Sequence, residues 1–201
     1  MKPDTVVFDL GGVLVDWNPR YLYGKLIPDK TEREKFLAEV CTHDWNVAQD
    51  AGRTIAEAVA EALSRHPDKG DLIRAFYDRF DEMLGGQIQG TVDILERLHA
   101  KGTPLYALTN WSAETFPIGR RRFPFLGLFR HITVSGELKL AKPDPAIYRH
   151  VLAAAGKPAQ ACVFIDDSPK NVDAARALGF HAVHFVDPEN LGRKLADLGF
   201  L

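Results

Sequence analysis

Long apolar runs are missing from this sequence. None of its segments reaches the roughly 18 consecutive apolar residues that a membrane-spanning helix needs. The opening residues 1–4 lead directly into a short strand-like run and lack the pattern of a secretory signal. We therefore expect a cytoplasmic protein without a membrane partner.

Cysteine and surplus charge are scarce as well. Cys41 and Cys162 are the only cysteines, and Cys162 lies in an apolar run, which favours a buried side chain over a disulfide or a metal ligand. The 25 basic and 27 acidic residues give a net charge of −2, so we expect no nucleic-acid partner. The seven histidines show no His-x-x-x-His spacing of a metal site.

Strand-like and helix-like segments alternate along most of the 201 residues, a length that suits one domain with a sizeable insert. The expected strands are short, rich in β-branched and aromatic residues, and bounded by turn signals. They cover residues 5–8, 104–108, 132–135, 161–165 and 182–186. Because helix signals separate them, the pattern predicts an α/β fold, with a parallel sheet and helices on both faces.

Between residues 17 and 86 the pattern is helical throughout. Capping boxes at Thr31–Glu34 and Thr54–Glu57 precede apolar residues at helical spacing. A third amphipathic helix is expected over residues 71–84, where Gly85-Gly86 would end it. We expect this block to be an insert after the first strand.

The first strand ends in a carboxylate. Asp9 follows the buried run 5–8 and precedes Gly11 and Gly12, which allow a sharp turn and the close approach of a ligand. Burying a carboxylate is costly, so Asp9 needs a partner or a chemical role. Taken alone, the pattern is equally consistent with a plain turn after a strand.

Polar residues also follow the other strands, and the carboxyl ends of parallel strands border the ligand crevice of such a sheet. The residues in question are Asp9, Thr109, Asn110, Ser135, Asp166 and Asp167. Carboxylates about 4 Å apart repel by roughly 4 kcal/mol at an effective dielectric near 20, so a cation is needed, and an all-oxygen set favours Mg²⁺. The alternative is that Asp166 and Asp167 cap the helix expected from Pro169.

Four motifs in this order resemble those of the haloacid dehalogenase superfamily. They are Phe8–Leu14, Ala107–Asn110, the lysine of Leu140–Pro145, and Val163–Asn171. The resemblance extends from about residue 6 to 186. It implies a Rossmann-like catalytic core made of residues 1–16 and 87–201, and a helical cap made of residues 17–86.

The resemblance also implies roles for individual residues. Asp9 would be the nucleophile, Thr109 and Asn110 would bind the transferred group, and Lys142 would stabilise its charge, although a surface lysine or the nearby Lys139 remains an alternative. Mg²⁺ would be held by Asp9, the Gly11 carbonyl and Asp167, with Asp166 a weak or indirect ligand. Trp111 would line the pocket or fill the seam between core and cap.

Gly11 departs from the family pattern, since most phosphatases of the family carry a second Asp there as general acid and base. General acid–base catalysis of this kind increases the rate by about 10²- to 10⁴-fold. Another group, such as Asp16, replaces it, or the leaving group needs no proton, or the protein is slow or inactive. Cap residues that could face the crevice are Trp17, Arg20, Trp45, Asn46, Asp50 and Arg53, although packing or exposure explains each equally well.

We therefore predict a Mg²⁺-dependent phosphatase of a small phosphorylated metabolite, with Asp16 and Arg20 among its substrate-binding residues and a monomeric or homodimeric state. One alternative is a 2-haloacid dehalogenase, which needs no metal and no second acid. Its fourth motif is typically rich in serine and asparagine, so the pair Asp166-Asp167 favours the phosphatase. The other alternative is a catalytically weak protein that binds a phosphorylated ligand or a partner.

Overall fold

Five parallel strands form the central sheet in the computed structural model, which describes residues 2–201. Their order across the sheet is β5-β4-β1-β6-β7, with β1 in the centre. The strands are β1 (Thr5–Phe8), β4 (Leu105–Thr109), β5 (His131–Val134), β6 (Cys162–Asp166) and β7 (His181–His184). The predicted α/β fold with a parallel sheet is confirmed; the bounds of β1 are as predicted, and those of the other strands differ by one or two residues.

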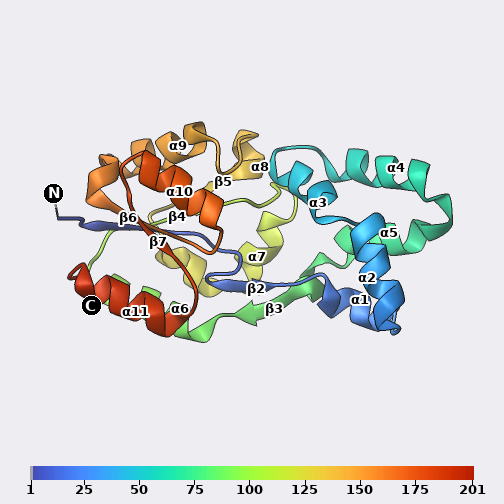
Figure 1. Ribbon diagram of the computed structural model, residues 1–201, viewed down its shortest axis with the longest axis horizontal. Helices are drawn as coiled ribbons and strands as arrows, with labels where there is room; N and C mark the ends of the chain where they lie inside the picture. The colour runs from blue at the N-terminus through green and yellow to red at the C-terminus, as the bar shows by residue number, and fades with distance from the viewer. Residues whose placement is uncertain (1) are drawn as a thin grey trace.

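Helices cover both faces of this sheet. In Figure 1, α9 (Pro145–Ala155) and α10 (Pro169–Ala177) lie above it, while α6 (Gln89–Ala100) and α11 (Pro188–Asp197) lie below it. Successive residues of a strand point to opposite faces, so Val7 joins one apolar cluster while Val6 and Phe8 join the other. Near one end of the sheet lie the shorter helices α7 (Phe116–Arg122) and α8 (Ser135–Leu138).

A block of helices gathers at the end of the molecule away from both termini (Figure 1). It contains α1 (Arg20–Leu26), α2 (Lys30–Glu39), α3 (His43–Asp50), α4 (Ile55–Arg65) and α5 (Gly70–Asp78). The capping box that begins α4 at Thr54 is confirmed. Among residues 2–201, no helix combines the length and the apolar character that crossing a membrane requires.

Two predictions about this block were wrong. The cap of α2 is Asp29, whose side chain accepts a hydrogen bond from the Glu32 amide, so Thr31 already lies inside the helix. The helix expected over residues 71–84 ends at Asp78 and is followed by the 3₁₀ turn Phe80–Met83 and the strand β3 (Leu84–Gln87).

Strand β3 pairs in antiparallel fashion with β2 (Val15–Trp17) and forms a two-stranded ribbon between the helical block and the sheet (Figure 1). Its sequence gave little strand signal because two of its four residues are glycines. A Cβ atom at Gly85 would lie 2.3 Å from the Asp16 carboxylate, which would have to move away to admit it. The predicted boundaries at residues 16/17 and 86/87 fall inside this ribbon, and the division into core and cap stays a prediction.

The turn after β1 has different requirements at its two glycines. Gly12 has φ = +71°, and a Cβ atom there would lie 2.3 Å from Oδ2 of Asp167. At Gly11 a Cβ atom would meet no atom within 4 Å, and the backbone is not in the left-handed region. Only Gly12 is therefore required by the geometry of the turn.

We expect Gly12→Ala to destabilise the fold, because a side chain in the left-handed region costs about 1–2 kcal/mol before the contact with Asp167 is counted. The Tm should fall by about 2–8 °C for a chain of this size. Gly11→Ala is the matched control and should change the free energy of unfolding by no more than about 0.5 kcal/mol. Equal Tm values for the two variants, measured by calorimetry, would contradict this account of the turn.

Candidate active site

Neighbouring strands place two acids at the same level of the sheet. In the parallel pair β1 and β6, Phe8 is in register with Ile165, and the Asp9 amide donates to the Ile165 carbonyl at 2.8 Å. The residues that follow, Asp9 and Asp166, therefore leave the two strands side by side. Both are buried, Asp9 being 7% exposed and Asp166 0%.

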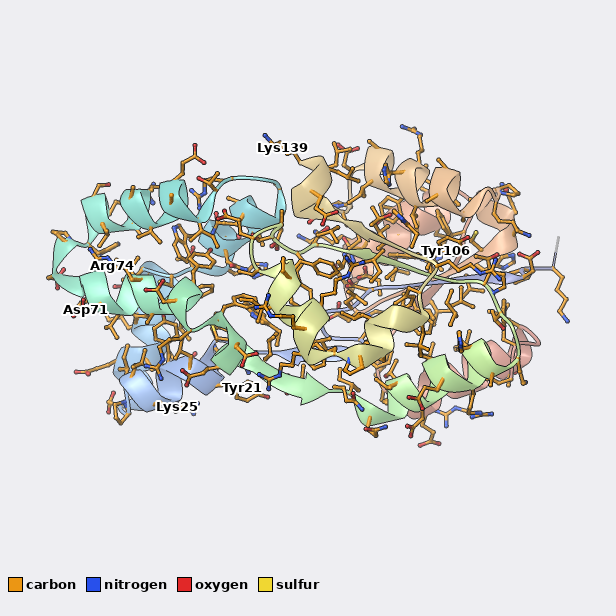
Figure 2. The ribbon with its side chains drawn as sticks, turned by 180° about the vertical axis from the view of Figure 1, so that it is seen from behind. Tyr21, Lys25, Asp71, Arg74, Tyr106 and Lys139 are labelled. Carbon is orange, nitrogen blue, oxygen red and sulfur yellow. The ribbon has the colours of Figure 1, made fainter. Side chains whose placement is uncertain are left out.

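Lys142 bridges these two carboxylates. Its Nζ lies 2.8 Å from Oδ1 of Asp9 and 2.7 Å from Oδ2 of Asp166, and it also donates to the Leu108 carbonyl at 3.0 Å. Lys139, the other candidate, is exposed and projects from the molecular surface in Figure 2. The structure thus brings Lys142, and not Lys139, to Asp9.

Asn110 holds the backbone of Lys142. Its side-chain oxygen accepts from the Lys142 amide at 2.8 Å, and its side-chain nitrogen donates to the Lys142 carbonyl at 3.0 Å. The preceding strand β4 ends at the buried Thr109, and Ser135 accepts a hydrogen bond from the Trp111 amide at 2.9 Å. Asn110 therefore fixes the backbone that carries the lysine, and Ser135 fixes the backbone of the residue after Asn110.

The two adjacent acids after β6 differ in their surroundings. Oδ1 of Asp166 accepts from the Ser168 amide at 2.8 Å and from Asn171 at 3.0 Å, while Oδ2 binds Lys142. Asp167 is exposed, and no cation in residues 2–201 forms an ion pair with it. Asp166 is thus committed to the protein, whereas the Asp167 carboxylate is open to a ligand.

Burial and like charges shift the titration of this cluster. Burial and the nearby charge of Asp166 raise the pKa of Asp9 to about 7, against the lowering effect of Lys142. For Lys142, burial acts to lower the pKa, but Asp9 and Asp166 hold it above its usual value, so the amine is charged. Partial burial of its carboxyl group and the charge of Asp166 raise the pKa of Asp167.

The acid cluster fits a divalent cation. Asp9, Asp166 and Asp167 each offer one oxygen, and these oxygens lie within 4.8 Å of one another. One lysine cannot balance three carboxylates, and hard oxygen donors suit Mg²⁺. Because the oxygens of Asp166 already accept hydrogen bonds, Asp9 and Asp167 are the better direct ligands.

A pocket of about 380 Å³ opens above the acids. Its floor includes Asp9, Gly11, Lys142 and Asp167, and its walls carry the aromatic side chains of Trp17, Phe80 and Trp111. A larger cavity of about 600 Å³ between α7 and β5 contains none of the predicted site residues. The chemistry-bearing groups therefore belong to the smaller pocket.

The six cap candidates separate into two groups in the structure. Trp17, Asn46 and Asp50 line the pocket. The other three are engaged within the helical block: Arg20 with Glu34, Arg53 with Glu61, and the Trp45 indole with the Ala58 carbonyl.

Asp16 accepts a hydrogen bond from Tyr21, an exposed side chain beside β3 (Figure 2). Asp16 and Arg20 do not line this pocket, and their contacts with a substrate stay predictions.

Several pocket residues had no distinctive signal in the sequence. They are His43, Val47, Phe80, Ser112, Thr115 and Lys170. Phe80 was assigned to the apolar side of a helix, and Ser112 directly follows the second strand-end motif. Ser112 and Lys170 could have been included from their positions in the chain, because they lie beside or within strand-end motifs. The places of His43, Val47 and Phe80 depend on how the helical block lies over the sheet.

Known proteins share this chain's sequence pattern and fold. The sesquiterpene phosphatase astK of Aspergillus oryzae is 29% identical over 184 residues, covering 91% of this chain and 90% of its own. A HAD family enzyme of Bacteroides thetaiotaomicron, crystallised with magnesium and inorganic phosphate, superposes with a TM-score of 0.68 at 24% identity, covering 92% of this chain and 95% of its own.

A 2-haloacid dehalogenase of Pseudomonas syringae has the same fold, with a TM-score of 0.64 at 20% identity and coverage of 97% of this chain and 99% of its own. The shared fold therefore does not separate the two activities. Residues 3–179 match the model of the haloacid dehalogenase-like hydrolases. This match covers most of the chain, including Asp9, Lys142 and the acids after β6, and the protein belongs to the haloacid dehalogenase-like hydrolase family.

Proposed function

We propose that this hydrolase is a Mg²⁺-dependent phosphatase that cleaves a small phosphorylated metabolite through an aspartyl-phosphate intermediate on Asp9. The observation that carries the proposal is a group of three carboxylates beneath a pocket, two of which are paired with one buried lysine. A metal-independent dehalogenase would have no evident need for the open carboxylate of Asp167.

The proposed ligands of Mg²⁺ are Asp9, Asp167 and the backbone carbonyl of Gly11, with Asp166 acting through Lys142 and through bound water. When bound, the ion would offset the charge of the carboxylates and of the phosphoryl group. Support comes from the oxygen cluster itself and from the relative that was crystallised with magnesium and phosphate.

Asp9 is oriented for attack by two donors on one of its oxygens. Lys142 Nζ and the Leu10 amide both donate to Oδ1, at 2.8 and 2.7 Å, which leaves Oδ2 as the attacking atom. A bond forms between Oδ2 and phosphorus while the bond to the leaving oxygen breaks. Water then attacks phosphorus, phosphate departs, and the Asp9 carboxylate is restored.

Lys142 would stabilise the charge that spreads over the phosphoryl oxygens in both steps. Thr109 is proposed to hydrogen-bond the same group, because it ends the strand next to β1. Asn110 would act mainly by holding Lys142, to which both ends of its amide are bonded.

The helices of residues 17–86 are proposed to act as the cap that selects the leaving group. The pocket volume of about 380 Å³ lies within the range of small-ligand sites, roughly 300–1,000 Å³. Trp17, Phe80 and Trp111 provide apolar wall, which suits a metabolite with a partly apolar leaving group. The sesquiterpene phosphatase among the relatives is consistent with such a substrate.

Asp9→Asn is expected to abolish phosphate release from phosphorylated metabolites, and EDTA should abolish it in the unaltered protein. A panel of about fifty phosphorylated metabolites and several 2-haloacids, assayed with Mg²⁺ or EDTA, tests both expectations. The control is Asp173→Asn, an exposed carboxylate of α10 that should leave the rate unchanged.

If the protein releases chloride from 2-chloropropionate and continues to do so in EDTA, it is a 2-haloacid dehalogenase and the phosphatase proposal is wrong. Gly11 is the observation that favours this second candidate, because a departing halide needs no proton. Binding of phosphorylated ligands without release of phosphate or chloride would identify a binding protein instead.

Lys142→Met should destabilise the metal-free protein by about 3–5 kcal/mol, because it leaves two buried carboxylates without their cation. Protonation relieves this cost, so the loss in Tm should be larger at pH 8 than at pH 5, and Mg²⁺ should recover part of it. Lys139→Met, at the exposed lysine nearby, is the control and should show neither effect. A pH-independent Tm difference would contradict the assigned charge balance.

A further inference from the structure

Asp50 brings a carboxylate from the helical block to the pocket that Asp9 and Asp167 also line. It is the last residue of α3 in the helical block, is partly buried, and lines the pocket that also contains Asp9, Gly11 and Lys142. No lysine, arginine or histidine of residues 2–201 forms an ion pair with it. A carboxylate in this position costs stability, so its presence calls for a functional reason.

The end of α3 is held rigidly, which fixes where Asp50 lies. Gln49 donates to the Trp45 carbonyl at 2.8 Å, and Arg53 donates to Gln49 and to the same carbonyl, each at 2.7 Å. Gly52, with φ = +97°, lies so close to the exposed Lys139 of the core that a Cβ atom would be 2.6 Å from its side chain. Arg53 therefore binds Gln49 and the Trp45 carbonyl, and the end of α3 packs against the core at Lys139.

The environment of Asp50 suits proton transfer near neutral pH. Burial raises the pKa of Asp50 to about 7, opposed by the nearby Ser112 backbone and by the charge of Lys142. The titratable or charged groups that face it are those of the pocket, of α5 and of the helix end, namely Asp9, His43, Lys142, Asp167, Lys170, Tyr77, Arg53 and Lys139.

The core itself has no acid at the position where most phosphatases of the family carry one, because Gly11 has no side chain. Asp16, the candidate from the sequence, is bonded to Tyr21 and does not line the pocket. Asp50 is the carboxylate that the helical block adds to the same cavity.

We propose that Asp50 is the general acid and base of this enzyme, supplied by the cap in place of the acid that Gly11 lacks. The proposal rests on the phosphatase function proposed above. As Oδ2 of Asp9 bonds to phosphorus, protonated Asp50 transfers its proton to the departing alkoxide and the leaving alcohol is neutral. The Asp50 carboxylate then takes a proton from the water that attacks the aspartyl phosphate, which restores both residues.

The test compares leaving groups of different basicity. For an alkyl phosphate, whose alkoxide needs a proton, Asp50→Asn should lower kcat/KM by about 10²- to 10⁴-fold. For p-nitrophenyl phosphate, whose phenolate departs unprotonated, kcat/KM should fall by less than about tenfold, since this ratio reports the first chemical step. Asp44→Asn, an exposed carboxylate on the same helix, should change neither ratio.

Rescue at the vacant position separates a chemical role from a structural one. A Cβ atom at Gly11 meets nothing within 4 Å, so this position has room for a side chain to begin, and Gly11→Asp is the rescue variant. In the Asp50→Asn background, Gly11→Asp should raise kcat/KM for the alkyl phosphate by about tenfold or more. In the unaltered protein, kcat/KM for the alkyl phosphate should decline above pH about 7, and Asp50→Asn should remove that decline.

Equal losses on both substrates, or no loss on the alkyl phosphate, would overturn the role of Asp50 while leaving the phosphatase function intact. If the unaltered protein is folded by circular dichroism but releases phosphate from neither substrate in the presence of Mg²⁺, the proposed phosphatase function is wrong. The proposed role of Asp50 would then be wrong as well.

Discussion

The ion pairs of Lys142 with Asp9 and Asp166 are the interaction on which the rest of the site depends. Two carboxylates leave adjacent strands side by side in a buried position, an arrangement that would be strongly unfavourable without a cation. The lysine offsets part of this charge, and its own placement requires Asn110, the Leu108 carbonyl and the loop before α9. The third acid, Asp167, adds to the net negative charge of the cluster, which favours the binding of a further cation.

This charge balance also explains why the surrounding backbone is so constrained. Gly12 must lack a side chain because the Asp167 carboxylate lies against it, and Asp166 must be satisfied by Ser168 and Asn171 because it is fully buried. Gly11 is under no such constraint. Its lack of a side chain is therefore a chemical feature of this protein, and it directs attention to groups that reach the pocket from the helical block.

The sequence predicted the elements whose signals are local. The strand 5–8, the capping box at Thr54, and the proline-initiated helices after Asp144 and Ser168 all occur where the residues indicated them. It failed at β3, because Leu84–Gln87 becomes a strand only by pairing with β2, seventy residues earlier in the chain, and glycine has no strand preference of its own. The cap of α2 was misplaced by two residues, since Asp29 and Thr31 are both suitable capping residues.

By itself, the sequence determined the order of strands and helices, the acids at the strand ends, and the absence of a side chain at position 11, because these follow from residue type and local periodicity. Only the tertiary structure decided that Lys142 rather than Lys139 meets Asp9, that Asp16 lies outside the pocket, and that Asp50 lies within it. These outcomes depend on the packing of segments far apart in the chain, where a shift of one residue or a small rotation of a helix moves a side chain from the pocket to the surface.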